Sequence, residues 1–367
     1  MNNSKKFNII TLLSFFSKNI IEIFISVILY KLGIGINKIL LYMLFNNIIS
    51  IILIILIMIF RNKIKIKWLI VINYISFVLF SIYLFNMSNN IYSLLLLSFL
   101  STLHNTLFWI LRHLYIIKIY DIENMSKKLG NILIICEISI ILSSYVGSTI
   151  LNNYSYIILI ILSSVILLIS NIILFNINIK LEKIEKIDFS ILKNNKQNLL
   201  LFTLEQFKII GVILFPLYIT IILNTSYKFI GIFNIFIGIA SIISLLYFTK
   251  LISKKKKSYL AVISIIFFII WILKINISIK FIIILIAFFE GIISKLYQIV
   301  INRFTYVLGK HYSYFNYIIV LELLFNFIKF IIMLIFMFFI KDLKLILYIC
   351  ACSFIVTSFV KFDDMHK

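Results

Sequence analysis

Residues 177–197, INIKLEKIEKIDFSILKNNKQ, form the longest polar stretch of a 367-residue chain that is otherwise mostly apolar. Six apolar stretches precede it and six follow it, and each is close to the ~20 residues of helix that a bilayer requires. These predicted spans are 8–30, 38–60, 67–85, 91–117, 130–151, 155–176, 198–222, 229–249, 258–276, 279–301, 314–340 and 343–360. The sequence therefore predicts an all-α polytopic membrane protein with twelve transmembrane helices.

The basic residues are unevenly divided between the links that alternate along the chain. Links on the side of the two termini carry 23 Lys and Arg residues, whereas the opposite links carry seven, including Lys274 and Lys280. Because basic residues gather on the cytoplasmic side, we predict an inner or plasma membrane protein with both termini cytoplasmic. Anionic lipid headgroups on that side, and not nucleic acid, are the expected partner of the net charge of +22.

The two halves of the chain look like copies of one unit. An offset of 190 residues places Lys38 on Lys228 and lays the basic link 61–67 over 251–257. Two six-span halves in the same orientation are typical of transporters whose substrate site lies between the halves.

With this topology the chain resembles the major facilitator superfamily. Local sequence adds Phe108–His113 (FWILRH), Gly147 and Leu214–Tyr218 (LFPLY) to the resemblance. Members of that family usually carry a Gly-x-x-x-Asp-x-x-Gly-Arg-type signature in the second-to-third link. Here 57–67, IMIFRNKIKIK, keeps only the basic residues. The resemblance therefore concerns the fold and indicates no particular substrate.

The resemblance implies a division of the chain into three parts. These are an N-terminal six-helix bundle over 1–176, a cytoplasmic linker over 177–197 and a C-terminal six-helix bundle over 198–367. It also implies a monomeric secondary transporter that moves a small-molecule substrate by alternating access, with proton coupling as one option. Such a protein is not an enzyme.

Charged residues occur within the predicted spans, five of them acidic and five basic. They are Glu22, Glu137, Glu205, Glu290, Glu322, Lys18, Arg112, Lys208, Lys295 and Lys329. A charge at the centre of a bilayer costs about 2.5–3.5 kcal/mol on insertion scales, so such residues normally face the bundle interior or water. Equal numbers of the two signs make internal ion pairs plausible.

The first span carries a polar stripe at helical spacing. It consists of Thr11, Ser14, Lys18 and Glu22. In the fourth span, Asn105 and Trp109 share a face in the same way. We predict that Lys18, Glu22, Asn105 and Trp109 line a central cavity. An internal Lys18–Glu22 pair that only orients its helix would give the same pattern.

Glu290 is the acid nearest to mid-membrane in the tenth span, with Ser294 and Tyr297 on its face. A carboxyl group at that depth can bind and release a proton when burial and neighbouring cations balance. Glu290 and Glu22 are therefore candidates for proton coupling. The alternative is that both are structural carboxylates held in ion pairs.

Two pairs of opposite charges lie at matched depths near the cytoplasmic ends of helices. Arg112 is expected to face Glu137, and Arg303 is expected to face Glu322. A guanidinium and a carboxylate form a strong charge-assisted hydrogen bond in a low dielectric. Such pairs serve either as a gate that breaks when the halves rock or as permanent staples between neighbouring helices.

No cofactor or metal site is expected. The sequence has no phosphate-binding glycine loop, and its four histidines have no metal-ligand spacing. Cys136, Cys350 and Cys352 lie within spans and are expected to be packing residues. A lipid-linked-oligosaccharide flippase and a membrane glycan polymerase or acyltransferase remain alternatives. The short external links, which have no His, argue against the enzymes, and the chain length and charged linker argue against the flippase.

Overall fold

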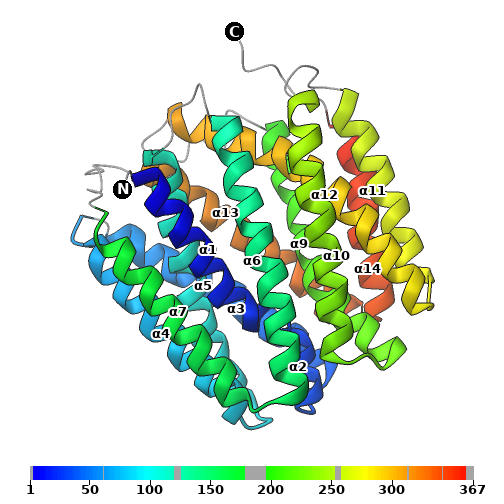
Figure 1. The fold of residues 1–367 in the computed structure, drawn as a ribbon, viewed down its shortest axis with the longest axis horizontal. Coiled ribbons are helices and arrows are strands. Elements are labelled where there is room, and N and C mark those ends of the chain that lie inside the picture. Colours follow the sequence, from blue (N-terminus) through cyan, green and yellow to red (C-terminus); the bar gives the residue numbers. More distant parts are fainter. Residues whose placement is uncertain are drawn as a thin grey trace.

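The computed structural model describes residues 3–60, 62–119, 125–177, 196–252, 258–311, 314–340 and 342–360, and this part of the chain is helical apart from short turns (Figure 1). The helices are α1 (Asn3–Glu22), α2 (Ile25–Lys31), α3 (Ile36–Phe60), α4 (Ile66–Asn86), α5 (Ile91–Ile119), α6 (Met125–Asn153), α7 (Tyr156–Phe175), α9 (Lys196–Leu223), α10 (Tyr227–Ile252), α11 (Ser258–Asn276), α12 (Lys280–His311), α13 (Tyr314–Phe339) and α14 (Leu343–Ser358). Most of the predicted linker, 178–195, lies outside the described residues.

Each predicted span corresponds to one helix, except that the first span contains α1 and α2. When α1 and α2 are counted as one helix, ten helices of the described residues are long and apolar enough to cross a membrane. Two further apolar stretches, Leu260–Asn276 and Leu343–Ser358, are shorter. The fold is that of an all-α integral membrane protein, as the sequence predicts.

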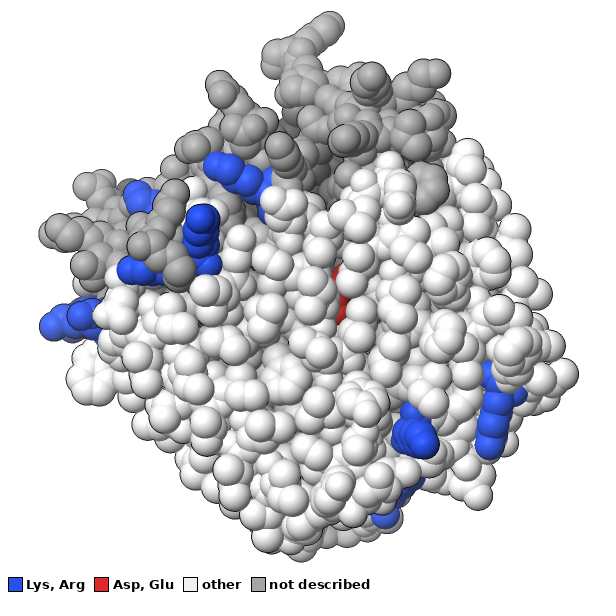
Figure 2. All heavy atoms as spheres, viewed as in Figure 1, with Lys and Arg blue, Asp and Glu red and all other residues white. Residues whose placement is uncertain are grey.

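The outer surface of the molecule suits a lipid environment. The face shown in Figure 2 is nearly free of charge through its middle, and its Lys and Arg residues gather toward the two ends. Large apolar side chains are exposed on the outside of many helices, including Ile59, Trp68, Phe281 and Phe338. Such a surface would aggregate in water, whereas in a bilayer it contacts hydrocarbon at little cost.

The break between α1 and α2 interrupts the first span immediately after Glu22. The amide of Phe24 donates to the carbonyl of Ile21 at 3.0 Å, so the chain tightens into a three-residue turn before the α-helical pattern resumes at Ile28. Neither glycine nor proline occurs at this point. The break is therefore a product of tertiary packing, and its effect is to place Glu22 at a helix end.

Helix packing repeats itself along the chain. Helix α5 packs against α3 and α4, and α7 packs against α1 and α4. In the second half, α12 packs against α10 and α11, and α14 packs against α9 and α11. The helix starts follow the same order: Ile36 of α3 and Tyr227 of α10 differ by 191 in sequence, close to the predicted offset of 190.

The two most extensive helix pairs between the first half of the chain and the second are α6 with α10 and α3 with α13, and α2–α9, α5–α12, α5–α13 and α6–α12 add smaller contacts. The α6–α10 contact depends on glycines of α10. A Cβ atom at Gly231 would lie 2.3 Å from Oγ of Ser148 and 2.8 Å from the carbonyl oxygen of Ser144. A Cβ at Gly238 would lie 2.5 Å from Cγ1 of Ile141. The two backbones can approach this closely only because these positions carry no side chain.

Substitution of Gly231 by Ala should therefore loosen the α6–α10 contact and destabilise the protein by about 1–3 kcal/mol, the usual cost of overpacking. Gly35→Ala is the matched control, because a Cβ there meets nothing within 4 Å. Thermal unfolding of the two variants in detergent tests this expectation. Equal melting temperatures for both variants and the parent would contradict it.

Candidate functional site

A cavity of about 330 Å³ lies at the centre of the helix assembly, between helices of the first half and α9 and α13 of the second. Its polar lining comes from α1, α3, α5 and α13: Lys18, Glu22, Tyr42, Asn46, Asn47, Ser50, Ser101, Thr102, Asn105, Thr106, Glu322, Asn326 and Lys329. In addition, α9 contributes an apolar wall of Ile209, Ile210 and Ile213, and the remaining lining residues are Ile25, Met43, Phe80 and Trp109. The cavity therefore offers both polar and apolar surface.

The structure places four of the predicted site residues together on one wall of this cavity. Nζ of Lys18 lies 3.4 Å from Oε2 of Glu22, and Asn105 forms a side-chain hydrogen bond with the Glu22 carboxyl group. The Lys18 ammonium also lies 4.8 Å from the ring centre of Trp109 and 4.3 Å from that of Phe108. Lys18 and Glu22 thus form an ion pair and line the cavity at the same time, so the two interpretations of the stripe are compatible.

The α13 side of the cavity carries the other two charged residues. Oε1 of Glu322 lies 3.4 Å from Nε2 of His113, an ionic contact only when the imidazole is protonated. Lys329 lines the cavity two helical turns further along α13. Among the described residues, no carboxylate lies within the 4.0 Å ion-pair distance of its ammonium group. Asn326 stands between Glu322 and Lys329 on the same helix face.

Beside the cavity, amide and hydroxyl groups form hydrogen bonds that connect α3 to α5. The residues that carry these groups are not among the predicted site residues. The Tyr42 hydroxyl donates to Oγ of Ser101 at 3.0 Å, and Thr102 donates to Oδ1 of Asn46 at 3.2 Å. The neighbouring residue Asn47 also lines the cavity. Adjacent asparagines in the middle of an apolar span are the sequence signal that could have located this wall.

The Glu290 group lies away from the central cavity. Oε1 of Glu290 is 2.6 Å from Nζ of Lys274, and both residues are buried between α11 and α12. The assignment of Lys274 to an exposed link is therefore wrong. Because its side chain turns inward over the ring of Trp271, at 3.6 Å, it neutralises the acid inside the protein.

Ser294 and Tyr297 are likewise separate from the cavity lining. The Ser294 hydroxyl donates to the carbonyl of Gly291 in its own helix at 3.2 Å. Tyr297 is fully buried, with its ring 6.0 Å from that of Phe267. The structure does not bring these two side chains together with Glu22 or the other cavity residues.

The prediction that Arg112 and Glu137 form an ion pair is wrong, because Glu137 has a different partner. Glu137 lies 2.6 Å from Nζ of Lys295, so the acid of α6 pairs with α12. Arg112 instead places Nη2 3.6 Å from Sγ of Cys136 and its guanidinium 4.8 Å from the ring centre of Phe15. The reason is helix rotation: Cys136 and Glu137 are neighbours on α6 and point about 100° apart.

Of the second predicted pair, Arg303 with Glu322, the structure describes only the side chain of Glu322. Arg303 belongs to α12, but its side chain lies outside the described residues. Glu322, its predicted partner, faces the central cavity and contacts His113.

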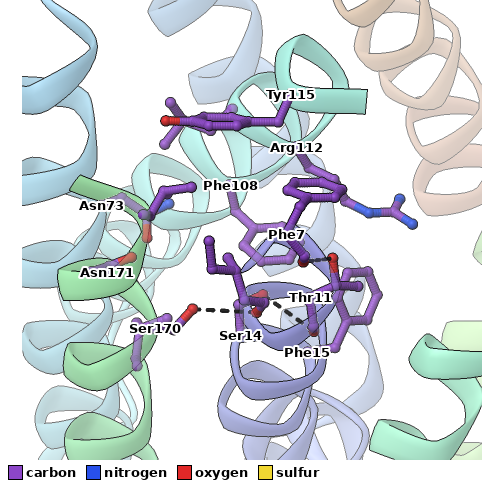
Figure 3. Close-up of a pocket in the computed structure, with 14 residues that line it drawn as sticks. Phe7, Thr11, Ser14, Phe15, Asn73, Phe108, Arg112, Tyr115, Ser170 and Asn171 are labelled. Carbon is purple, nitrogen blue, oxygen red and sulfur yellow. Dashed lines mark hydrogen bonds between the residues drawn. The ribbon is translucent and has the colours of Figure 1, made fainter. Parts of the chain in front are cut away.

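A second and much smaller pocket, of about 40 Å³, lies inside the first half of the chain between α1, α4, α5 and α7 (Figure 3). Thr11 and Ser14 line this pocket, where each donates to a backbone carbonyl of α1. The predicted polar stripe thus divides, since only Lys18 and Glu22 reach the central cavity. In Figure 3 the guanidinium of Arg112 extends away from the other labelled side chains.

Comparison with known proteins identifies the fold. No protein-family model matches the sequence, and no curated protein matches it significantly. The structure is similar to a bacterial homologue of the iron transporter ferroportin in an outward-facing state (TM-score 0.70, 8% identity, 98% of each chain). It is also similar to the human organic anion transporter MFSD10 (TM-score 0.66, 7% identity, 97% of this chain and 98% of the other) and to the nucleoside transporter NupG (0.64, 14%, 98% of each chain). The chain has the fold of major facilitator superfamily transporters.

The Glu137–Lys295 pair, in which the acid is buried and the base is mostly buried, yields a prediction about stability. Glu137→Leu leaves the Lys295 ammonium group with the neutral Gln298 side chain but without its counter-charge, and it should destabilise the protein by about 3–5 kcal/mol, whereas Glu137→Leu with Lys295→Met should recover most of that loss. Thermal unfolding in detergent measures both effects. A double variant no more stable than the single variant would show that the two side chains do not act as a pair.

Proposed function

We propose that this protein is a secondary transporter that moves a small solute across the membrane by alternating access. The observation that carries the proposal is the central cavity, which holds two lysines and two glutamates at membrane depth between helices from both halves of the chain. A volume of about 330 Å³ falls within the range of small-molecule sites. Charged residues inside a membrane protein are costly and normally mark a solute or ion pathway.

We further propose that 1–176 and 198–367 form two six-helix bundles related by a twofold axis along the membrane normal, with 177–197 between them as a linker. The repeated packing order and the similar spacing of equivalent helices support this arrangement. Under the proposed axis the two seams, α6–α10 and α3–α13, are equivalent to each other. Two equivalent seams would allow one bundle to rock against the other about the cavity.

The rocking motion would break contacts at each end of the molecule in turn. At the end that carries α2, the ring of Tyr227 lies 6.1 Å from that of Phe24, and the Lys31 ammonium lies 3.9 Å from the same Tyr227 ring. Toward the opposite end, the halves meet through Glu137–Lys295 and through Glu322 with His113. We propose these two groups of contacts as the gates, with the α2 end outside the cell because of the basic asymmetry of the sequence.

We propose Glu22 as the residue through which any proton coupling would act. It faces the cavity and lies beside the break between α1 and α2. A change in its charge would therefore alter both its interaction with the solute and the conformation of the chain at this break. Glu290 is held by Lys274 away from the cavity and has no such route to the solute. This proposal assigns Glu290 a structural role.

Distances between spin labels test alternating access without knowledge of the solute. Labels at Leu32 and Ser226 report on the α2 end, and labels at Trp68 and Leu200 report on the opposite end; all four residues are exposed. The Tyr227→Ala substitution removes the ring that joins the halves at the α2 end. It should lengthen the first distance and shorten the second, because one motion moves both ends.

The Glu137→Ala variant is the reciprocal experiment, since it weakens a contact toward the opposite end. It should shift the same two distances in the reverse directions. If both distances change in the same sense, or if neither changes in either variant, the protein does not rock about its cavity and the transport proposal fails.

A further inference from the structure

The charges around the central cavity do not pair completely. Lys18 lies 3.4 Å from Glu22, and Glu322 contacts His113 at 3.4 Å. Lys329 lines the cavity with no carboxylate within ion-pair distance among the described residues. The charges that act on it are the Glu322 carboxylate, which attracts it, and the Lys18 ammonium, which repels it. The cavity therefore presents one ammonium group without a direct partner.

A second cation stands beside the same wall. The guanidinium of Arg112 lies 5.0 Å from the ring centre of Trp109, which lines the cavity, and its charge repels Lys18. Within the described part of the chain, Arg112 has no ion-pair partner. The residues that line the cavity include two basic and two acidic groups, Lys18 and Lys329 with Glu22 and Glu322, and Arg112 lies behind this lining, against Trp109. Of the two lysines, Lys18 is paired with Glu22, whereas Lys329 has no direct carboxylate partner among the described residues.

An unpaired charge in a low-dielectric interior is unfavourable unless a counter-charge joins it. A bound anion supplies that charge, and an ammonium group binds a carboxylate or sulfonate through charge-assisted hydrogen bonds. The apolar wall formed by Ile209, Ile210 and Ile213 would contact a hydrocarbon body, and a cavity of about 330 Å³ is much larger than an inorganic ion requires. The site is thus suited to a molecule with one charged end and one apolar part.

We infer that the solute is an organic monoanion whose carboxylate or sulfonate group binds Lys329 and whose apolar part packs against the α9 isoleucines. The inference rests on the proposed transport function and names the class of solute. The unpaired ammonium group of Lys329 disfavours organic cations at this site. A zwitterion is also disfavoured, because Glu22 and Glu322 already contact Lys18 and His113.

The test is direct binding to the purified full-length protein in detergent, measured as ligand-induced thermal stabilisation. The ligands are a panel of short-chain to medium-chain and aromatic carboxylates, each paired with its uncharged carboxamide, together with the corresponding amines. Carboxylates should stabilise the parent protein, whereas amides and amines of the same shape should not. Titration of the best carboxylate gives its apparent affinity.

Two variants assign the effect to Lys329. Lys329→Met should weaken carboxylate binding roughly tenfold to a hundredfold, the change expected from one charge-assisted hydrogen bond. Lys329→Arg keeps the charge and should retain the preference for carboxylates over amides. Lys280→Met removes an exposed lysine at the start of α12 and is the control that should bind like the parent.

Three outcomes would overturn the inference: no carboxylate of the panel binds the parent, amides or amines bind as well as carboxylates, or Lys329→Met binds carboxylates like the parent. The control for folding is the melting temperature of each variant without ligand. If Lys329→Met is unstable, the test is whether Lys329→Arg retains the preference for carboxylates over amides, and loss of that preference would contradict the inference. The spin-label distances do not depend on the solute. Reciprocal motion with no anion preference would therefore reject this inference and leave the transport proposal standing.

Discussion

The cost of holding charge inside a membrane is the constraint on which this structure depends. Charged residues of the helices avoid that cost by pairing across short distances. The described pairs are Lys18–Glu22, Glu205–Lys208, Glu137–Lys295 and Lys274–Glu290. The last two join different helices, so the same interactions that neutralise charge also fix helix positions. The central cavity is the place where this compensation is incomplete, and the candidate site is located there.

Both halves of the chain contribute to the lining of the cavity. From the second half, α9 contributes isoleucines and α13 contributes charged and amide groups, whereas α3 and α5 contribute amides and hydroxyls that form hydrogen bonds with each other. A relative movement of the halves would therefore change what a bound solute contacts. At the α6–α10 seam, Gly231 and Gly238 allow the two backbones to approach closely, with Ser148 and Ile141 of α6 packed against them.

Much of the fold could be predicted because bilayer thickness fixes helix length, and apolar runs of that length are plain in the sequence. Helical periodicity also placed Lys18 and Glu22 on one face and predicted their exposure to a cavity. Ion-pair partners could not be predicted in the same way. Hydropathy does not show whether a lysine near a helix end, such as Lys274, points outward or turns inward to an acid. The partner of Glu137 depends on which helices are neighbours, and that information is tertiary.

The most direct test of the account is the accessibility of the cavity from the two sides of the membrane. Thr102→Cys places a thiol in the cavity lining, in a background without Cys136, Cys350 and Cys352. The account predicts that a membrane-impermeant thiol reagent labels this residue both in intact cells and in inverted vesicles. Leu97→Cys, buried in the core on the same helix, should remain unlabelled in both preparations. Labelling of residue 102 from one side only, or from neither side, would contradict the claim that the cavity opens alternately to both.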